Sequence, residues 1–216
     1  MRMKNFVVIV LWTFLPLAGR AQVFGSPAES YVKNGVKPFI MGGIAACDYF
    51  GKYSGGVKTT VGYSIEFGIE VPFRNKLYGF QPALRLIRKG AKVPWVMEGQ
   101  ADTDVSQFYL EMPLDFTVCF GLTQNGCFKS YGGLYISYGV AGTVEHKGSS
   151  YDTFGSSGYD FSRFDLGLDV GLSYEYKKFI VRIGVETGFI PVREDDNMGR
   201  EWPRNRCMYL GVGLYL

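Results

Sequence analysis

The chain contains a single histidine, His146, which lies close in sequence to Ser149, Ser150 and Asp152. Histidine, serine and aspartate catalyse hydrolysis when a fold brings their side chains into hydrogen-bonding contact. Closeness in sequence does not build such a triad, and no serine of the chain lies in a recognisable nucleophile turn. A surface hydrolase that uses His146 is therefore one alternative, and a polar loop histidine without a catalytic role is the other.

The residues that could bind a metal are poorly spaced for that purpose. Residues 194–197 (EDDN) offer carboxylates to Ca²⁺, but they lack the spacing of a calcium-binding loop. The four cysteines form no C-x-x-C pair and no cluster with histidine, which argues against a zinc site. We therefore expect no metal and no cofactor, and we interpret residues 194–197 as a solvated acidic turn.

Most of the other ionisable side chains recur at every second position of strand-like segments. In residues 165–176 (DLGLDVGLSYEY), Leu, Val and Tyr alternate with Asp, Gly, Ser and Glu. This period of two is typical of a β-strand with one apolar and one polar face. The same pattern predicts eight strands, at residues 38–49, 59–71, 78–89, 105–120, 131–144, 165–176, 179–189 and 206–216.

The connections between these strands alternate in length. The long ones, such as residues 90–104 and 145–160, follow strands one, three, five and seven, and the others are short turns. Outer-membrane barrels have short periplasmic turns, longer external loops and an even number of strands. We therefore predict an all-β fold, an eight-stranded antiparallel up-and-down transmembrane β-barrel at residues 37–216.

Alternation alone does not say which face of the strands points outward. A soluble, exported, lipocalin-like barrel that binds a ligand has the opposite arrangement, with an apolar interior. The polar face here is rich in Gly and Ser, which suits a crowded interior better than a surface in water. Aromatic residues also gather at predicted strand ends, as interfacial girdles do: Tyr49, Phe50, Tyr78, Tyr131, Tyr138, Tyr174, Tyr176 and Phe179.

With the apolar face outward, ten charged side chains point into the lumen. They are Glu66, Glu70, Arg85, Lys89, Glu111, Asp115, Asp165, Asp169, Arg182 and Glu186. Isolated buried charges are costly, so we expect a hydrogen-bonded ion network across the lumen. Such a network is either a polar conduit or a plug that stabilises the barrel. The plug is favoured, because the interior of eight strands is just wide enough for its own side chains.

Four cysteines in an exported chain indicate disulfides. Strands one and eight must pair to close the barrel, and this places Cys47 near Cys207. Cys119 and Cys127 flank a single short turn. We predict these two pairs. The alternative is four reduced thiols, because the shear of the barrel could separate Cys47 from Cys207.

Residues 1–21 have the features of a secretory signal peptide. Arg2 and Lys4 precede the apolar run 6–17, and small residues lead to a cleavage site after Ala21. A membrane anchor helix is the alternative, but the run is shorter than a span requires. We expect residues 22–36 to be a periplasmic lead-in. Without the leader the chain is neutral, so nucleic acid is not an expected partner.

Three strands resemble those of a known family. Residues 109–121 (YLEMPLDFTVCFG), 132–139 (GGLYISYG) and 164–176 (FDLGLDVGLSYEY) are similar to strands of PorT-like outer-membrane β-barrel domain proteins, small barrels akin to the OmpA and OmpX type. The resemblance implies an integral protein of the bacterial outer membrane with variable surface loops. The name-giving member is linked to protein secretion, but no residue here carries that role over.

The predicted external loops contain four aromatic residues, Trp95, Tyr151, Tyr159 and Trp202. Exposed aromatic side chains often anchor protein interfaces. These residues are the best candidates for contact with a protein partner. The alternative, which is slightly favoured, is that they pack on each other or lie at the lipid headgroups. The expected function is thus a structural or interaction role in the outer membrane, in contact with its lipid, and not catalysis.

Overall fold

The computed structural model describes residues 35–52, 54–73, 77–94, 103–122, 126–146, 148–154, 161–193 and 202–216. The predicted signal peptide and all but the last two residues of the predicted lead-in fall outside these ranges, as do Trp95, Tyr159 and residues 194–197. Across the described residues, no helix has the length and apolar character needed to cross a membrane.

Nine strands are formed by the described residues, and all of their pairings are antiparallel. Their bounds are β1 Lys37–Phe50, β2 Lys58–Pro72, β3 Tyr78–Val93, β4 Thr103–Leu122, β5 Gly126–His146, β6 Ser149–Asp152, β7 Phe164–Tyr176, β8 Phe179–Pro191 and β9 Arg204–Tyr215.

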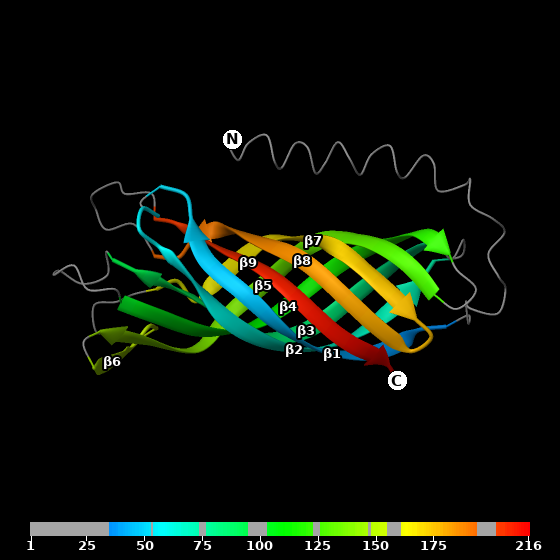
Figure 1. Ribbon diagram of the computed structural model, residues 1–216, viewed down its shortest axis with the longest axis horizontal. Helices are drawn as coiled ribbons and strands as arrows, with labels where there is room; N and C mark the ends of the chain where they lie inside the picture. Colours follow the sequence, from blue (N-terminus) through cyan, green and yellow to red (C-terminus); the bar gives the residue numbers. More distant parts are fainter. Residues whose placement is uncertain are drawn as a thin grey trace.

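Eight of these strands close into a barrel (Figure 1). Each pairs with its neighbours in the chain, and β1 pairs with β9 from Phe39↔Tyr215 to Phe50↔Arg204. This last ladder joins the first strand to the last, so the sheet has no open edge along its wall. The predicted eight-stranded up-and-down barrel is confirmed.

The ninth strand, β6, was predicted as part of a loop. Among the described residues it pairs only with the end of β5, from Thr143↔Asp152 to His146↔Ser149. All four of its residues are exposed, so it has no buried face and leaves no alternation in the sequence. Strand β5 also begins at Gly126 rather than at residue 131, because its ladder with β4 continues as far as Leu122↔Cys127.

The two ends of the barrel differ. The ends of β1, β5 and β8, which lead into long connections, lie at the left in Figure 1, and the β7–β8 turn lies at the right with the C-terminus. The turn between β7 and β8 consists of only Lys177 and Lys178. This is the distribution predicted for external loops and periplasmic turns.

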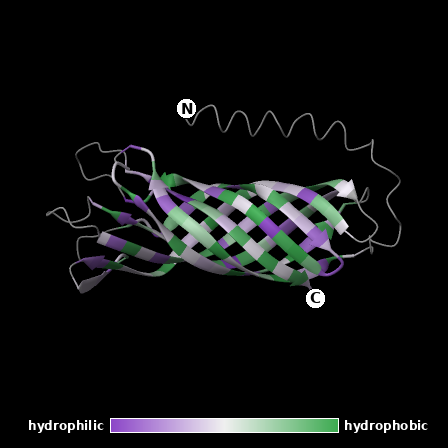
Figure 2. Cartoon of the chain, viewed as in Figure 1, coloured by the Kyte–Doolittle hydropathy of each residue, from purple (hydrophilic) through white to green (hydrophobic). Residues whose placement is uncertain are grey.

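The outer wall of the barrel is apolar. Large aliphatic side chains on it are exposed, for example Val61 (70%) and Ile183 (51%), while Arg85 and Glu111 are buried inside. Figure 2 shows the alternation of hydrophobic and hydrophilic residues along the strands. A soluble barrel requires the reverse arrangement, so the lipocalin-like alternative is wrong for this chain.

Two of the aromatic residues predicted for the girdles point inward instead. Tyr49 and Tyr131 are nearly inaccessible, because they share the parity of the inward positions of their strands. Tyr131 crosses the lumen above Gly184, where an added Cβ would collide with the Tyr131 hydroxyl and lie 2.7 Å from the Tyr209 ring. Glycine at this position therefore provides the space that the large tyrosines fill.

Candidate functional site

The centre of the lumen is organised around Arg85 of β3. Its Nε donates to Glu66 at 2.6 Å, and its Nη1 donates to Glu111 at 3.3 Å. Nη1 also pairs with Glu186, and Nη2 with Asp169 at 3.4 Å. These carboxylates come from β2, β4, β8 and β7, so one guanidinium connects opposite walls of the barrel. The guanidinium also lies over the Tyr209 ring, with its central carbon 4.8 Å from the ring centroid.

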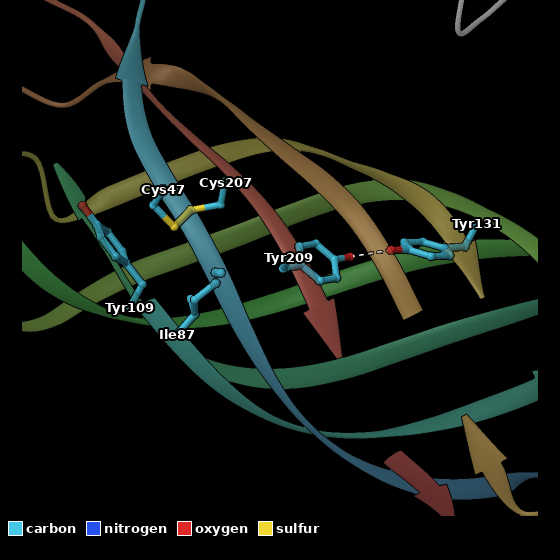
Figure 3. Packing of buried hydrophobic residues seen from close by; sticks show 7 residues of the cluster. Cys47, Ile87, Tyr109, Tyr131, Cys207 and Tyr209 are labelled. Carbon is cyan, nitrogen blue, oxygen red and sulfur yellow. Dashed lines mark hydrogen bonds between the residues drawn. A yellow bond between two sulfur atoms is a disulfide. The ribbon is translucent and has the colours of Figure 1, made fainter. Parts of the chain in front are cut away.

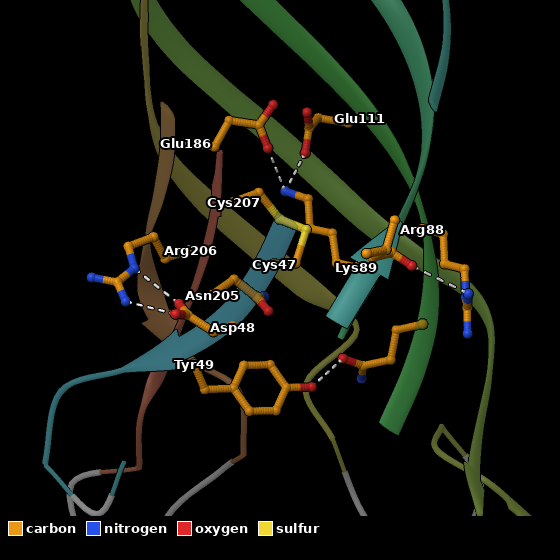
Figure 4. Close-up of a disulfide and its surroundings, with 12 residues drawn as sticks. Cys47, Asp48, Tyr49, Arg88, Lys89, Glu111, Glu186, Asn205, Arg206 and Cys207 are labelled. Atoms are coloured by element: carbon orange, nitrogen blue, oxygen red, sulfur yellow. Dashed lines mark hydrogen bonds and ion pairs between the residues drawn. A yellow bond between two sulfur atoms is a disulfide. The ribbon is translucent and has the colours of Figure 1, made fainter. Parts of the chain in front are cut away.

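Two further cations extend this network. Arg182 donates to Glu66 at 2.9 Å and to the Gln81 side-chain oxygen at 2.7 Å. On the loop side, Lys89 pairs with Glu111 at 2.6 Å and Glu186 at 3.0 Å, as Figure 4 shows. The buried charges are thus paired with one another, which is the condition for placing them away from water.

A second cluster lies nearer the short turns. Lys129 is held between Glu70 at 2.5 Å and Glu175 at 2.6 Å. The Tyr215 hydroxyl donates to Glu175 at 2.6 Å and also to Glu70. Sequence reasoning missed Lys129, which lies before the predicted start of its strand, and left Glu175 out of the network. The alternation of residues 165–176 could have included Glu175.

Two acids of the predicted network, Asp115 and Asp165, form no ion pair with a described cation. Asp165 accepts hydrogen bonds from the Tyr135 hydroxyl at 3.1 Å and from Asn205 at 3.0 Å. Asp115 is buried, and no described residue lies within hydrogen-bonding distance of its Oδ1. The predicted set therefore divides into paired charges around Arg85 and Glu70 and two acids outside those ion pairs.

Apolar layers lie on both sides of the charged layer. Toward the loops, Tyr49, Val93, Val105, Val144 and Phe161 form part of a buried cluster. Toward the turns, a second cluster comprises Phe39, Met41, Ala83, Ile180 and Tyr215. The lumen is thus filled along its length by packed side chains.

Both cysteine pairs are disulfides in the structure. Cys47 of β1 is joined to Cys207 of β9, and these two residues are also register partners. Figure 3 shows this bond inside the barrel, in the cluster that contains Ile87 and Tyr109. The second bond links Cys119 to Cys127 across the β4–β5 turn. The first therefore closes the barrel seam covalently, and the second closes one hairpin.

The loop-side rim carries the other candidate residues. Tyr151 is 41% exposed on β6, whereas Trp202 is 8% exposed and lies beneath the Arg193 guanidinium at 4.7 Å. Trp202 is therefore part of the packed rim rather than a free contact residue. Trp202 is the only tryptophan among the described residues.

His146 does not form a triad with the described residues. Its Nδ1 lies 3.0 Å from the Thr103 hydroxyl, and its register partner is Ser149. No described acid contacts the imidazole. In the same described ranges, no three His, Cys, Asp or Glu side chains are grouped to hold a metal ion.

Residues 42–194 match the family described as outer membrane protein beta-barrel domain. The chain belongs to this family. It is an integral β-barrel protein of the bacterial outer membrane. No curated protein matches the chain.

Solved structures with the same architecture are distant in sequence. Neisserial surface protein A (NspA) aligns at 17% identity and a TM-score of 0.51, over 84% of this chain and 99% of that one. Ail of Yersinia pestis, solved with the heparin analogue sucrose octasulfate, aligns at 15% identity and a TM-score of 0.48, over 84% of this chain and 99% of that one. OprG of Pseudomonas aeruginosa aligns at 15% identity and a TM-score of 0.44, over 85% of this chain and 97% of that one. At these identities the NspA likeness shows the fold alone.

Proposed function

We propose that this outer-membrane barrel does not conduct ions and acts through its external rim, as a binding surface for a protein partner. The observation that carries the first part is the contact of Arg85 with carboxylates from four different strands. Side chains from opposite walls meet at the barrel axis, and apolar clusters lie above and below them. An ion in transit would have to separate these buried pairs.

The second part rests on the shape of the rim. Strand β5 pairs with β7 only as far as Tyr138↔Phe164, yet it continues to His146. At about 3.3 Å per residue, the part of β5 beyond Tyr138 extends about 26 Å along the strand, and β6 pairs with its last residues, from Thr143 to His146. The projection is visible at the lower left of Figure 1. It holds the exposed strand β6, which includes Tyr151.

Catalysis is not part of this proposal, because the described contact of His146 is with Thr103 and not with an acid. A hydrolytic activity that disappears in His146→Ala would contradict it. Within the family, the likeness of residues 109–121, 132–139 and 164–176 to PorT-like barrels supports membership of that group.

Two measurements test the proposal. The folded protein in a planar lipid bilayer is expected to give no single-channel currents, and regular current steps would refute the closed lumen. A photo-crosslinking residue at position 151 in intact cells is expected to yield a discrete protein adduct. The matched control is position 183, which faces lipid and is 51% exposed. Equal protein adducts at both positions, or none at 151, would refute the rim as the binding surface.

A further inference from the structure

Strand β6 (Ser149–Asp152) is the edge strand of the sheet that projects from the loop side of the barrel. It is the last strand in the order of the sheet, after β5, and Figure 1 shows it at the lower left, at the far loop-side end. All four of its residues are exposed. An edge strand presents backbone groups to which a segment of another chain can add as a further strand.

The hydrogen bonds of β6 show which of its backbone groups point away from β5. The Thr153 amide donates to the Gly142 carbonyl at 3.1 Å, one step beyond the end of the β5–β6 ladder. In an antiparallel pair, hydrogen-bonded and non-hydrogen-bonded residues alternate. Tyr151, two residues before Thr153, therefore directs its backbone groups at β5, whereas Ser150 and Asp152 direct theirs away from it.

These outward groups are open in the part of the chain that the structure describes. On that side, no described residue forms a hydrogen bond with the backbone of Ser150 or Asp152. Each of the two residues offers one N–H and one C=O, at the alternate positions that a second extended strand would pair with. The edge can therefore form a short ladder with an added segment.

The base of β6 is fixed to β5, so the edge is held in place. Arg163, directly before β7, donates from Nη1 to the Gly139 carbonyl at 3.0 Å and from Nη2 to the Phe154 carbonyl at 2.8 Å. Its guanidinium carbon lies 5.0 Å from the centroid of the Phe154 ring. That ring packs over Gly139, where an added Cβ would lie 2.3 Å from it. A fixed edge lowers the entropy cost of binding.

The segment around β6 is acidic. Residues 143–160 contain Glu145, Asp152 and Asp160 against one lysine, Lys147. Glu145 lies on β5 beside β6, Asp152 lies on β6 itself, and neither forms an ion pair with a described residue. Opposite charges on neighbouring strands stabilise a sheet, and like charges destabilise it. An added strand with basic residues is therefore favoured, whereas a second copy of this acidic segment is not.

We propose that the β6 edge binds an extended, basic segment of a partner protein, which adds to the projecting sheet as a further strand. The backbone of Ser150 and Asp152 supplies the hydrogen bonds, and the carboxylates of Glu145 and Asp152 select lysine or arginine on one face of the segment. This inference rests on the role proposed above for the rim and names the kind of partner segment that the rim takes.

The test measures peptide binding by the folded barrel in phosphatidylcholine nanodiscs, by fluorescence anisotropy. The probe is a labelled, short peptide of alternating Thr and Lys, and the control peptide has Glu in place of Lys. S150P removes one outward N–H and leaves the bonds to β5 in place, because proline is tolerated at edge positions whose N–H faces solvent. G55P is the matched control, since Gly55 is the second residue of the turn that the Val57 amide closes onto the Ser54 carbonyl, where proline fits.

We expect the Thr-Lys peptide to bind the unmodified protein about fivefold more tightly than the Thr-Glu peptide does. S150P should weaken binding of the Thr-Lys peptide about fivefold, the value of one hydrogen bond. It should also bind that peptide more weakly than S150A, which keeps the N–H. E145Q/D152N should weaken binding on the order of fivefold, and G55P should stay within about twofold of the unmodified protein.

Four results would overturn the proposal. Equal binding by S150P and S150A would exclude strand addition, and equal binding of the two peptides would exclude the preference for a basic segment. Self-association of the unmodified protein that S150P abolishes would make the occupant a second copy. Hydrogen exchange of the Tyr151 amide checks that S150P keeps β6 paired with β5; if it does not, unchanged binding in E145Q/D152N overturns the proposal.

Photo-crosslinking at position 151 separates this inference from the role proposed for the rim. We expect the protein adduct there to be lost in S150P and kept in G55P. An adduct that persists in S150P would overturn strand addition and leave the rim as the binding surface. If position 151 gives no adduct while the Thr-Lys peptide binds and S150P weakens that binding, the role of the rim in cells fails and the binding property of the edge stands.

Discussion

The disulfide between Cys47 and Cys207 should stabilise the barrel more than the one between Cys119 and Cys127. The first closes a loop with a sequence separation of 160, and the second a loop with a separation of 8. In the chain-entropy model, a crosslink lowers the entropy of the unfolded chain and so raises the unfolding free energy. The increase is about 5 kcal/mol for the long loop and about 2.5 kcal/mol for the short one. The expected difference between the two is therefore about 2.5 kcal/mol.

The assay is urea unfolding of the barrel in phospholipid vesicles, followed by tryptophan fluorescence. C47A/C207A and C119A/C127A each remove one bond and leave no free thiol from that pair. Because the substitutions also remove the packing of the buried sulfur atoms, reduction of the remaining disulfide in each variant provides a second measurement that opens a loop without removing any sulfur atom. The expected order of unfolding free energy is unmodified protein, then C119A/C127A, then C47A/C207A.

This reasoning would be refuted if C119A/C127A lost as much unfolding free energy as C47A/C207A, or more. The same holds if reduction of C119A/C127A, which opens only the long loop, leaves its unfolding free energy unchanged. Either result would mean that the link between the first and last strands does not restrict the unfolded chain as its length requires.

The other predictions concern buried charge and close packing, and the same urea assay measures them. R85M removes the cation that joins four buried carboxylates, and it leaves Asp169 without an ion pair to a described residue. It should lower the unfolding free energy by about 3–5 kcal/mol. R206M breaks a partly exposed pair with Asp48 and should lower it by less than about 1 kcal/mol; equal losses would contradict the central role of Arg85. G184A places a Cβ against Tyr131 and should cost about 1–3 kcal/mol. G42A, where the nearest atom is 4.0 Å away, should change stability by less than about 0.5 kcal/mol; a larger effect at position 42 than at 184 would refute the packing argument.

The sequence alone determined the class of fold and the direction of most side chains. The two-residue period of segments such as 165–176 is a property of the extended chain, so it identifies a strand and its two faces before any partner is known. The same parity distinguishes Tyr131 and Tyr49 as inward residues, although their position near strand ends suggested the girdle. Strand β6, with no buried face, left no such pattern.

The tertiary structure decided which side chains meet. Arg85 contacts Glu66 on the neighbouring strand but also Asp169 and Glu186 on β7 and β8, far away in the sequence. Those contacts depend on how the ladders are staggered when β1 closes on β9, and local periodicity contains no information about that stagger. For the same reason Lys129 could not be placed beside Glu70 in advance.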